Sequence, residues 1–97
     1  MKDYVHEHFA RHHGDMVRPR IVCADGFSLS VQASEEHYCT PRATGADRYD
    51  SVEIGFSGRP DGSLYRANIL RGGGAGVAGW VPVDRVNRWI AYHGGTQ

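Results

Sequence analysis

Residues Asp25–Arg42 read DGFSLSVQASEEHYCTPR, and the other segments of the chain are organised around this stretch. Its first half alternates between apolar and polar residues, with Phe27, Leu29, Val31 and Ala33 apolar and Ser28, Ser30 and Gln32 polar. This alternation predicts a strand with one face in the core and the other facing solvent or a partner. Asp25-Gly26 is a two-residue turn signal, so we predict a hairpin of Arg20–Ala24 and Phe27–Ala33 joined by a type I′ turn.

The second half of the stretch opens a long connection, residues 34–50 (SEEHYCTPRATGADRYD), that has no clear period. Connections longer than about 12–15 residues are uncommon in small domains and are often functional. Tyr and Arg are residues that anchor protein interfaces. We therefore predict a partner-binding site at Glu35, Glu36, His37, Tyr38 and Arg42. In the alternative reading the loop is a structural clasp, with Cys39 a small hydrophobe in the core and Arg42 holding backbone carbonyls.

The flanking segments predict two helices and further strands. Residues 3–13 form a helix that Gly14 stops, and Pro82–His93 form another, with Pro82 at its first position and Gly94-Gly95 after its end. Strands are expected at Ser51–Ser57, Leu64–Leu70 and Val77–Val81. Trp80 and Trp89 are expected to cover the core. The result is one α+β domain over residues 1–97, an antiparallel sheet of four to five strands with the N-terminal and C-terminal helices packed on it.

Composition excludes several classes of protein. The 11 basic and 11 acidic residues balance, which gives neither a field that attracts nucleic acid nor the acidic surface of a DNA mimic. No apolar run approaches the roughly 18–20 residues of a membrane span, and the N-terminal MKDYVHEHF lacks a signal-peptide core. We therefore expect a cytoplasmic protein, in the host cell if it is of phage origin. Two cysteines are too few for a disulfide framework.

Three candidate chemistries fall short of a motif. His8 and His12 have the i, i+4 spacing of helical zinc ligands, and His37, Cys39 and Cys23 could add to them, but no CxxC or HExxH frames the set. Gly74–Gly79 matches GxGxxG without the helix and acidic residue of a dinucleotide site. His37 and Cys39 are two residues apart, yet no third group orients them as a nucleophile and base. We expect no enzyme activity and no cofactor, and a small metal-binding domain is kept as the second alternative.

Nucleic-acid binding is the first alternative function, although direct binding is disfavoured. The arginines that could converge are Arg18, Arg20, Arg42, Arg48, Arg66 and Arg71, with Tyr38, Tyr49 or Tyr65 available to stack on bases. Acidic residues are interleaved with them, at Glu35, Glu36, Asp47 and Asp50, which indicates a mixed surface.

Three blocks of the sequence resemble a group of small phage and prophage proteins. These are DGFSLSVQASEEHYCTPR, SVEIGFS at 51–57, and GWVPVDRVNRWIAYHGG at 79–95. The family pattern is D-G-F-x-x-S-V-Q-A-S-x-x-H-Y-C-x-P-R, then V-E-x-G-F, then Y-V-P-V before a helix ending in H-G-G. The chain departs from it at Ser57-Gly58, where the family has Pro-Ser, and at the glycine run 72–76.

The resemblance implies a phage origin and carries no assigned activity or functional residues. Small phage accessory proteins often inhibit host defence, and anti-CRISPR proteins are prominent among them. Our leading hypothesis is therefore a non-enzymatic phage protein that binds and blocks a host protein complex, which could be a CRISPR effector.

Overall fold

The computed structural model describes residues 2–58 and 77–97. In chain order the elements are α1 (Tyr4–Arg11), β1 (Ile21–Val22), β2 (Ser28–Gln32), β3 (Ser51–Gly58), β4 (Val77–Pro82) and α2 (Val83–Tyr92). The expected strand at Leu64–Leu70, the glycine run 72–76 and the first half of the GxGxxG match, residues 74–76, lie outside the described residues. None of the helices in the described part is long and apolar enough to cross a membrane.

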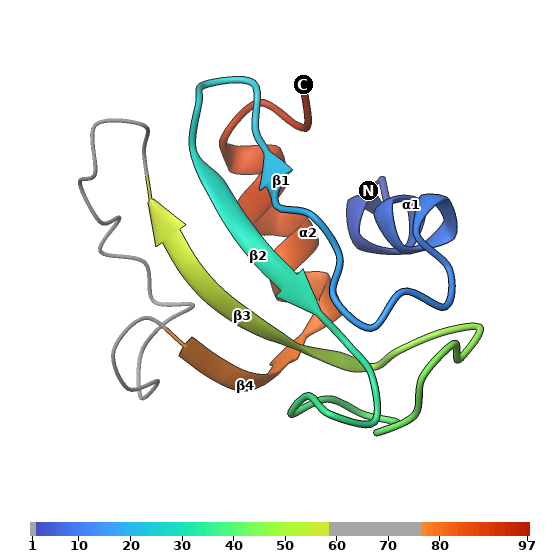
Figure 1. The fold of residues 1–97 in the computed structure, drawn as a ribbon. Helices are drawn as coiled ribbons and strands as arrows, with labels where there is room; N and C mark the ends of the chain where they lie inside the picture. The colour runs from blue at the N-terminus through green and yellow to red at the C-terminus, as the bar shows by residue number, and fades with distance from the viewer. Residues whose placement is uncertain (1, 59–76) are drawn as a thin grey trace.

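The strands form one antiparallel sheet in the order β1-β2-β3-β4. Helix α2 lies behind the sheet, and α1 lies beside β1 with its axis in a different direction (Figure 1). The α+β prediction is thus confirmed, with an N-terminal and a C-terminal helix and four strands in the described part.

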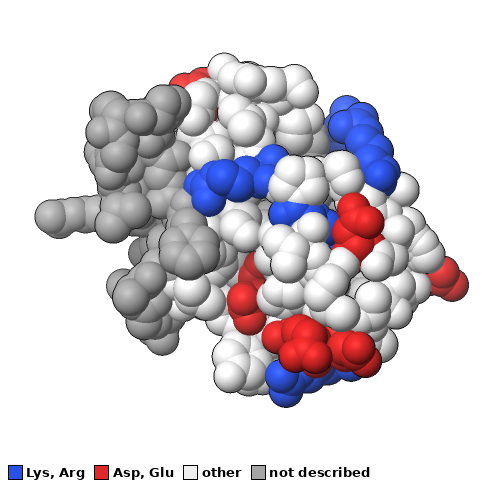
Figure 2. Space-filling model, in the orientation of Figure 1, with Lys and Arg blue, Asp and Glu red and all other residues white. Residues whose placement is uncertain are grey.

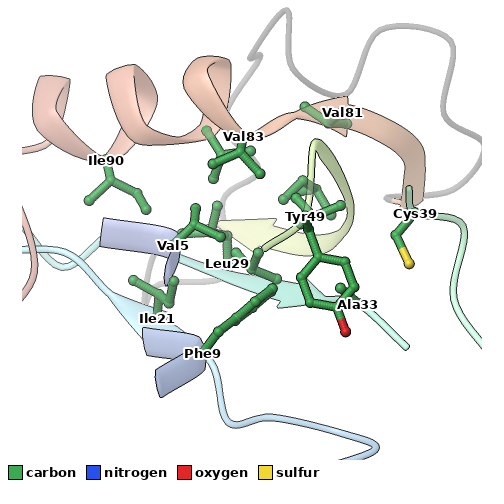
Figure 3. Packing of buried hydrophobic residues seen from close by; sticks show 14 of the residues in the cluster. Val5, Phe9, Ile21, Leu29, Ala33, Cys39, Tyr49, Val81, Val83 and Ile90 are labelled. Carbon is green, nitrogen blue, oxygen red and sulfur yellow. The ribbon is translucent and has the colours of Figure 1, made fainter. Parts of the chain in front are cut away.

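One core joins the sheet to both helices. The inward positions of the strands and one face of each helix supply its residues, among them Val5, Phe9, Leu29, Val31, Val52, Ile54, Val86 and Ile90. Figure 3 shows Val83 and Ile90 of α2 pointing toward Val5 and Phe9 of α1 and toward Leu29 of β2. The alternation of the Asp25–Arg42 stretch therefore does place Phe27, Leu29, Val31 and Ala33 in the core. Gln32 is an exception, because it was expected on the exposed face and is buried.

The hairpin turn differs from the prediction. Cys23 N–H donates to Phe27 O at 2.7 Å, and Gly26 N–H donates to Cys23 O at 3.0 Å. This closes a three-residue loop, Ala24–Gly26, in which Gly26 takes a φ of 90° and Asp25 does not take a positive φ. A type I′ turn needs positive φ at both central residues, so that prediction is wrong. The Asp25 carboxylate accepts the Phe27 N–H at 3.0 Å, an Asx turn that fixes the loop instead.

The ends of the helices follow local chemistry. Gly95 N–H donates to Ile90 O and Gly94 N–H to Ala91 O, both at 3.0 Å, and both glycines have positive φ. This is a Schellman ending, as the sequence indicated. Helix α2 begins at Val83, so Pro82 is its N-cap and not its first helical residue as predicted. Helix α1 ends at Arg11 with His12 as its C-cap, so Gly14 lies outside the helix and does not stop it directly.

The N-terminus of α1 is tied to α2 through one polar group. Asn87 is buried, accepts the Val5 N–H at 3.0 Å and donates to Asp3 at 3.1 Å. Asp3 is the N-cap of α1 and accepts the His6 N–H. Burial alone would raise the pKa of Asp3, but the hydrogen bonds from the His6 backbone, the Asn87 side chain and the His6 ring lower it to about 2. These bonds stabilise the charged carboxylate and so help to fix how the two helices pack.

Candidate partner-binding surface

A bulge in the β3–β4 pair sets the geometry of the surface. Val52 pairs with Val81 and Ile54 pairs with Ala78, so Glu53 alone faces both Gly79 and Trp80. The extra residue breaks the alternation of β4, and Ala78 and Val81 are both buried while Trp80 is 57 % exposed. The expectation that Trp80 covers the core is therefore wrong. Trp89 does pack against the core, as expected.

Trp80 has an unusual backbone conformation. Its φ of 53° lies in the left-handed region, and it is the one non-glycine residue with positive φ in the described part of the chain. A side chain with a Cβ is disfavoured there by roughly 1–2 kcal/mol. Backbone strain of this kind persists only where surrounding contacts fix it, and it clusters at functional sites.

The contact that fixes Trp80 comes from the loop after β2. Tyr38 O accepts the Trp80 N–H at 2.9 Å, and the two rings stack with centroids 4.9 Å apart and planes 28° apart. Gly79 permits this approach, since a Cβ built there would lie 2.8 Å from the Tyr38 Cβ. Tyr38 itself is 48 % exposed. Two large aromatic side chains are thus held together with much of their surface open.

Charged groups surround the aromatic pair. The Arg42 guanidinium lies 5.3 Å from the centre of the Tyr38 ring, within the range of a cation–π contact. The Glu53 carboxylate accepts the Tyr38 N–H at 3.0 Å. We call Tyr38, Trp80, Arg42 and Glu53, with the adjacent exposed Glu35 and Glu36, the Tyr38–Trp80 surface.

The predicted site residues are neighbours along a tight turn that starts at Ser34. The Ser34 hydroxyl is buried, accepts the Glu36 N–H at 3.0 Å and lies 2.6 Å from Nδ1 of His37. The Ser34 hydroxyl thus links the Glu36 backbone to the His37 ring at the start of the turn. Glu35 and Glu36 remain exposed, and acidic side chains gather over the loop that follows β2 (Figure 2).

The loop is also a clasp. Cys39 is buried, its thiol lies 3.3 Å from Ser34 O, and burial raises its pKa. Arg42 donates through Nε to Glu35 O at 3.1 Å, so it holds the loop through a backbone carbonyl as the alternative reading expected. Both readings therefore describe the same loop, whose inner side is in the core and whose outer side carries Tyr38, Glu35 and Glu36.

The geometry gives little support to thiol or metal chemistry. Burial and the Asp25 charge raise the pKa of Cys23 to about 11, so neither cysteine holds much thiolate at neutral pH. The His8 and His12 rings are neighbours, 4.9 Å apart, but His8 Nε2 bonds to Pro19 O. Across residues 2–58 and 77–97, no three His, Cys, Asp or Glu side chains form a group that could hold a metal ion.

Two of the arginines and tyrosines considered for nucleic-acid binding do not lie on an open surface. Arg18 and Tyr49 are buried, with exposures of 3 % each, so neither is on a face that a nucleic-acid strand could follow. Arg48 lies 3.4 Å from the Asp3 carboxylate. Arg66, Arg71 and Tyr65 lie outside the described residues.

No family model, curated protein or solved structure matches this chain. A partner-binding role is therefore inferred from the geometry of the Tyr38–Trp80 surface. The sequence prediction included Tyr38 and Arg42 of this surface and did not include Trp80 or Glu53. The available signal for Trp80 was Gly79, a glycine inside a strand, which often marks a bulge or a close backbone approach.

Proposed function

We propose that this chain is a non-enzymatic protein of phage origin that binds and inhibits a host defence complex, of which a CRISPR effector is one candidate. The Tyr38–Trp80 surface is the proposed contact. The observation that carries the proposal is Trp80, a large aromatic side chain that is 57 % exposed on a left-handed backbone. Trp, Tyr and Arg are the residue types that dominate binding energy in protein interfaces.

The charge of the surface favours a basic protein partner. Glu35, Glu36 and Glu53 contribute carboxylates, whereas Arg42 is the cation packed on Tyr38. Phosphates would meet this negative excess unfavourably, so the surface suits a protein better than a nucleic acid. Lysine or arginine side chains of a partner could meet both the carboxylates and the open aromatic faces.

A pull-down from host lysate with variants of the bait tests the proposal. We expect the wild-type chain to retain a stoichiometric host protein that Trp80→Gly and Tyr38→Ala lose. Tyr92→Ala is the matched control, because Tyr92 is an aromatic side chain on α2 that is 72 % exposed and lies outside the surface. Retention of the same protein by Trp80→Gly, or its loss with Tyr92→Ala, would contradict the assignment of the surface.

Inhibition needs its own measurement. The partner from the pull-down is assayed for its own activity with increasing amounts of wild-type or Trp80→Gly protein. We expect stoichiometric inhibition by the wild type and none by the variant at the same concentrations. A partner that keeps full activity when saturated would leave binding intact and refute the inhibitory role.

The nucleic-acid alternative predicts a different result. Binding to labelled DNA or RNA at low salt should then be measurable and should weaken steeply as salt rises. On our proposal, binding at low salt is negligible.

A further inference from the structure

Arg18 is the most buried arginine in the described part of the chain, with an exposure of 3 %. Gln32 of β2 fixes its backbone from both sides, accepting the Arg18 N–H and donating to Arg18 O, each at 2.8 Å. The Arg18 Nη1 donates to Ala33 O at 2.7 Å, and the Arg18 guanidinium lies 4.0 Å from the centre of the Phe9 ring. Contacts from β2 and α1 thus fix the position of the Arg18 side chain, which is not a mobile surface group.

The charge of Arg18 has only neutral partners. Among the described residues, no carboxylate oxygen forms an ion pair with the guanidinium, and its Nε is buried without a hydrogen-bond partner. A buried charge is costly unless it is paired and hydrogen-bonded. The Ala33 carbonyl and the Phe9 ring stabilise the guanidinium in part, but neither carries a negative charge that would neutralise it.

Arg18 lines a pocket of about 240 Å³. Phe9, Ala10 and His13 of α1 and the segment after it line one side, and Ala46 and Asp47 line the other. This volume is smaller than the roughly 300–1,000 Å³ of pockets that bind drug-sized ligands, so it fits a small group.

The imidazole of His6 also lines the pocket, and hydrogen bonds at both of its nitrogens hold it in place. Its Nε2 accepts the Tyr49 N–H at 3.0 Å, and its Nδ1 lies 2.8 Å from the Asp3 carboxylate. An imidazole whose Nε2 accepts must carry its proton on Nδ1, so His6 is neutral and both nitrogens are occupied. His13, another lining residue, has its Nε2 3.3 Å from Gly45 O. Arg18 is therefore the cation that a ligand would meet.

We propose that this pocket binds a small oxyanion, a phosphate or a carboxylate, with Arg18 as its counter-charge. A planar guanidinium is the side chain best suited to both groups, because its N–H donors match the spacing of their oxygens. The site is separate from the Tyr38–Trp80 surface and does not depend on the proposed function. The exposed carboxylate of Asp47 also lines the pocket, and its negative charge repels an anion and lowers the affinity.

Titration of the purified chain with sodium phosphate or sodium acetate, followed by calorimetry and by the thermal midpoint, tests the proposal. Sodium chloride at equal ionic strength is the reference. We expect saturable binding and a rising midpoint with at least one of the two oxyanions, and the anion that binds more tightly identifies the ligand class. A midpoint that follows ionic strength alone, equally in all three salts, overturns the site.

A matched pair of variants assigns the binding to the pocket without disturbing Arg18. Ala10 is exposed on α1 and lines the pocket, so Ala10→Glu adds a negative charge there and Ala10→Gln adds the same bulk without charge. The added negative charge should weaken binding by about tenfold in Ala10→Glu relative to Ala10→Gln. Asp47→Asn should tighten it. Equal affinities in the two Ala10 variants would refute the pocket as the site.

Discussion

Replacing Trp80 by Gly and by Ala tests the left-handed backbone conformation of this residue, the most unusual feature of the described structure. Both variants lose the ring stack with Tyr38, which contributes about 0.5–1.5 kcal/mol to stability beyond its buried area. They differ in the backbone. At a φ of 53° alanine keeps the steric cost of about 1–2 kcal/mol, whereas glycine has no Cβ and avoids it.

The expected difference between the variants follows from two opposing effects. Glycine gains the relief of about 1–2 kcal/mol but loses about 0.5–1 kcal/mol through the greater freedom of its unfolded chain. The net result favours Trp80→Gly over Trp80→Ala by about 0.5–1 kcal/mol. At ordinary strand positions the order is reversed, so the sign alone carries the test.

Urea unfolding followed by circular dichroism measures this difference. For a chain of this size the midpoint of Trp80→Gly should lie about 0.5 M above that of Trp80→Ala. Val22 of β1, exposed and without a positive φ, is the control position, and there Ala should be the more stable by about 0.5–1 kcal/mol. If Trp80→Ala is as stable as Trp80→Gly, then the bulge does not hold Trp80 in the left-handed region and the reasoning fails.

Three other predictions concern the neighbouring contacts and the titratable groups. Gly79→Ala should lower stability by about 1–3 kcal/mol, because its Cβ would lie 2.8 Å from the Tyr38 Cβ. It should also weaken the near-ultraviolet circular dichroism expected from the stacked Tyr38 and Trp80 rings, and an unchanged spectrum would contradict the close approach. Because hydrogen bonds lower the pKa of Asp3 to about 2, its stabilising contribution is complete above about pH 4 and is lost as the pH falls toward 2. Asp3→Asn should flatten the loss of stability in that window by about 1 kcal/mol, after allowance for solvent screening, and equal acid curves would refute the role of the carboxylate. Cys23 and Cys39 should react with a thiol reagent at pH 7 at least tenfold more slowly in the native protein than in urea, since both thiols are buried and their pKa values are raised; comparable rates would show that one of them is accessible.

The sequence was sufficient where short-range patterns decide the structure. Alternation from Phe27 to Ala33 predicts the core strand, because side chains two apart share a face of a sheet. Gly94-Gly95 predicts the end of α2, because glycine accepts the positive φ that a Schellman ending needs. The α+β class and the two terminal helices follow from such local rules.

Pattern rules were insufficient where a specific hydrogen bond decides the structure. Arg18-Pro19-Arg20 reads as a pair of surface cations, yet Gln32 and Ala33 of β2 bind Arg18 and bury it against Phe9. The turn at Asp25-Gly26 reads as type I′, yet the Asp25 side chain selects another loop. In each case the deciding contact is a specific hydrogen bond, and composition and spacing do not encode its geometry.

The loop that follows β2 shows both contributions in one place. The sequence alone determined that residues 34–50 form a long connection, and it predicted Glu35, Glu36 and Tyr38 on its surface, where the structure has them exposed. Only the tertiary structure placed Trp80 beside them. The bulge opposite Glu53 rotates Trp80 out of the core, and Tyr38, 42 positions earlier in the chain, accepts its N–H. The pairing of strands fixes that register, and a strand pattern read residue by residue places Trp80 on the wrong face because one inserted residue reverses the alternation.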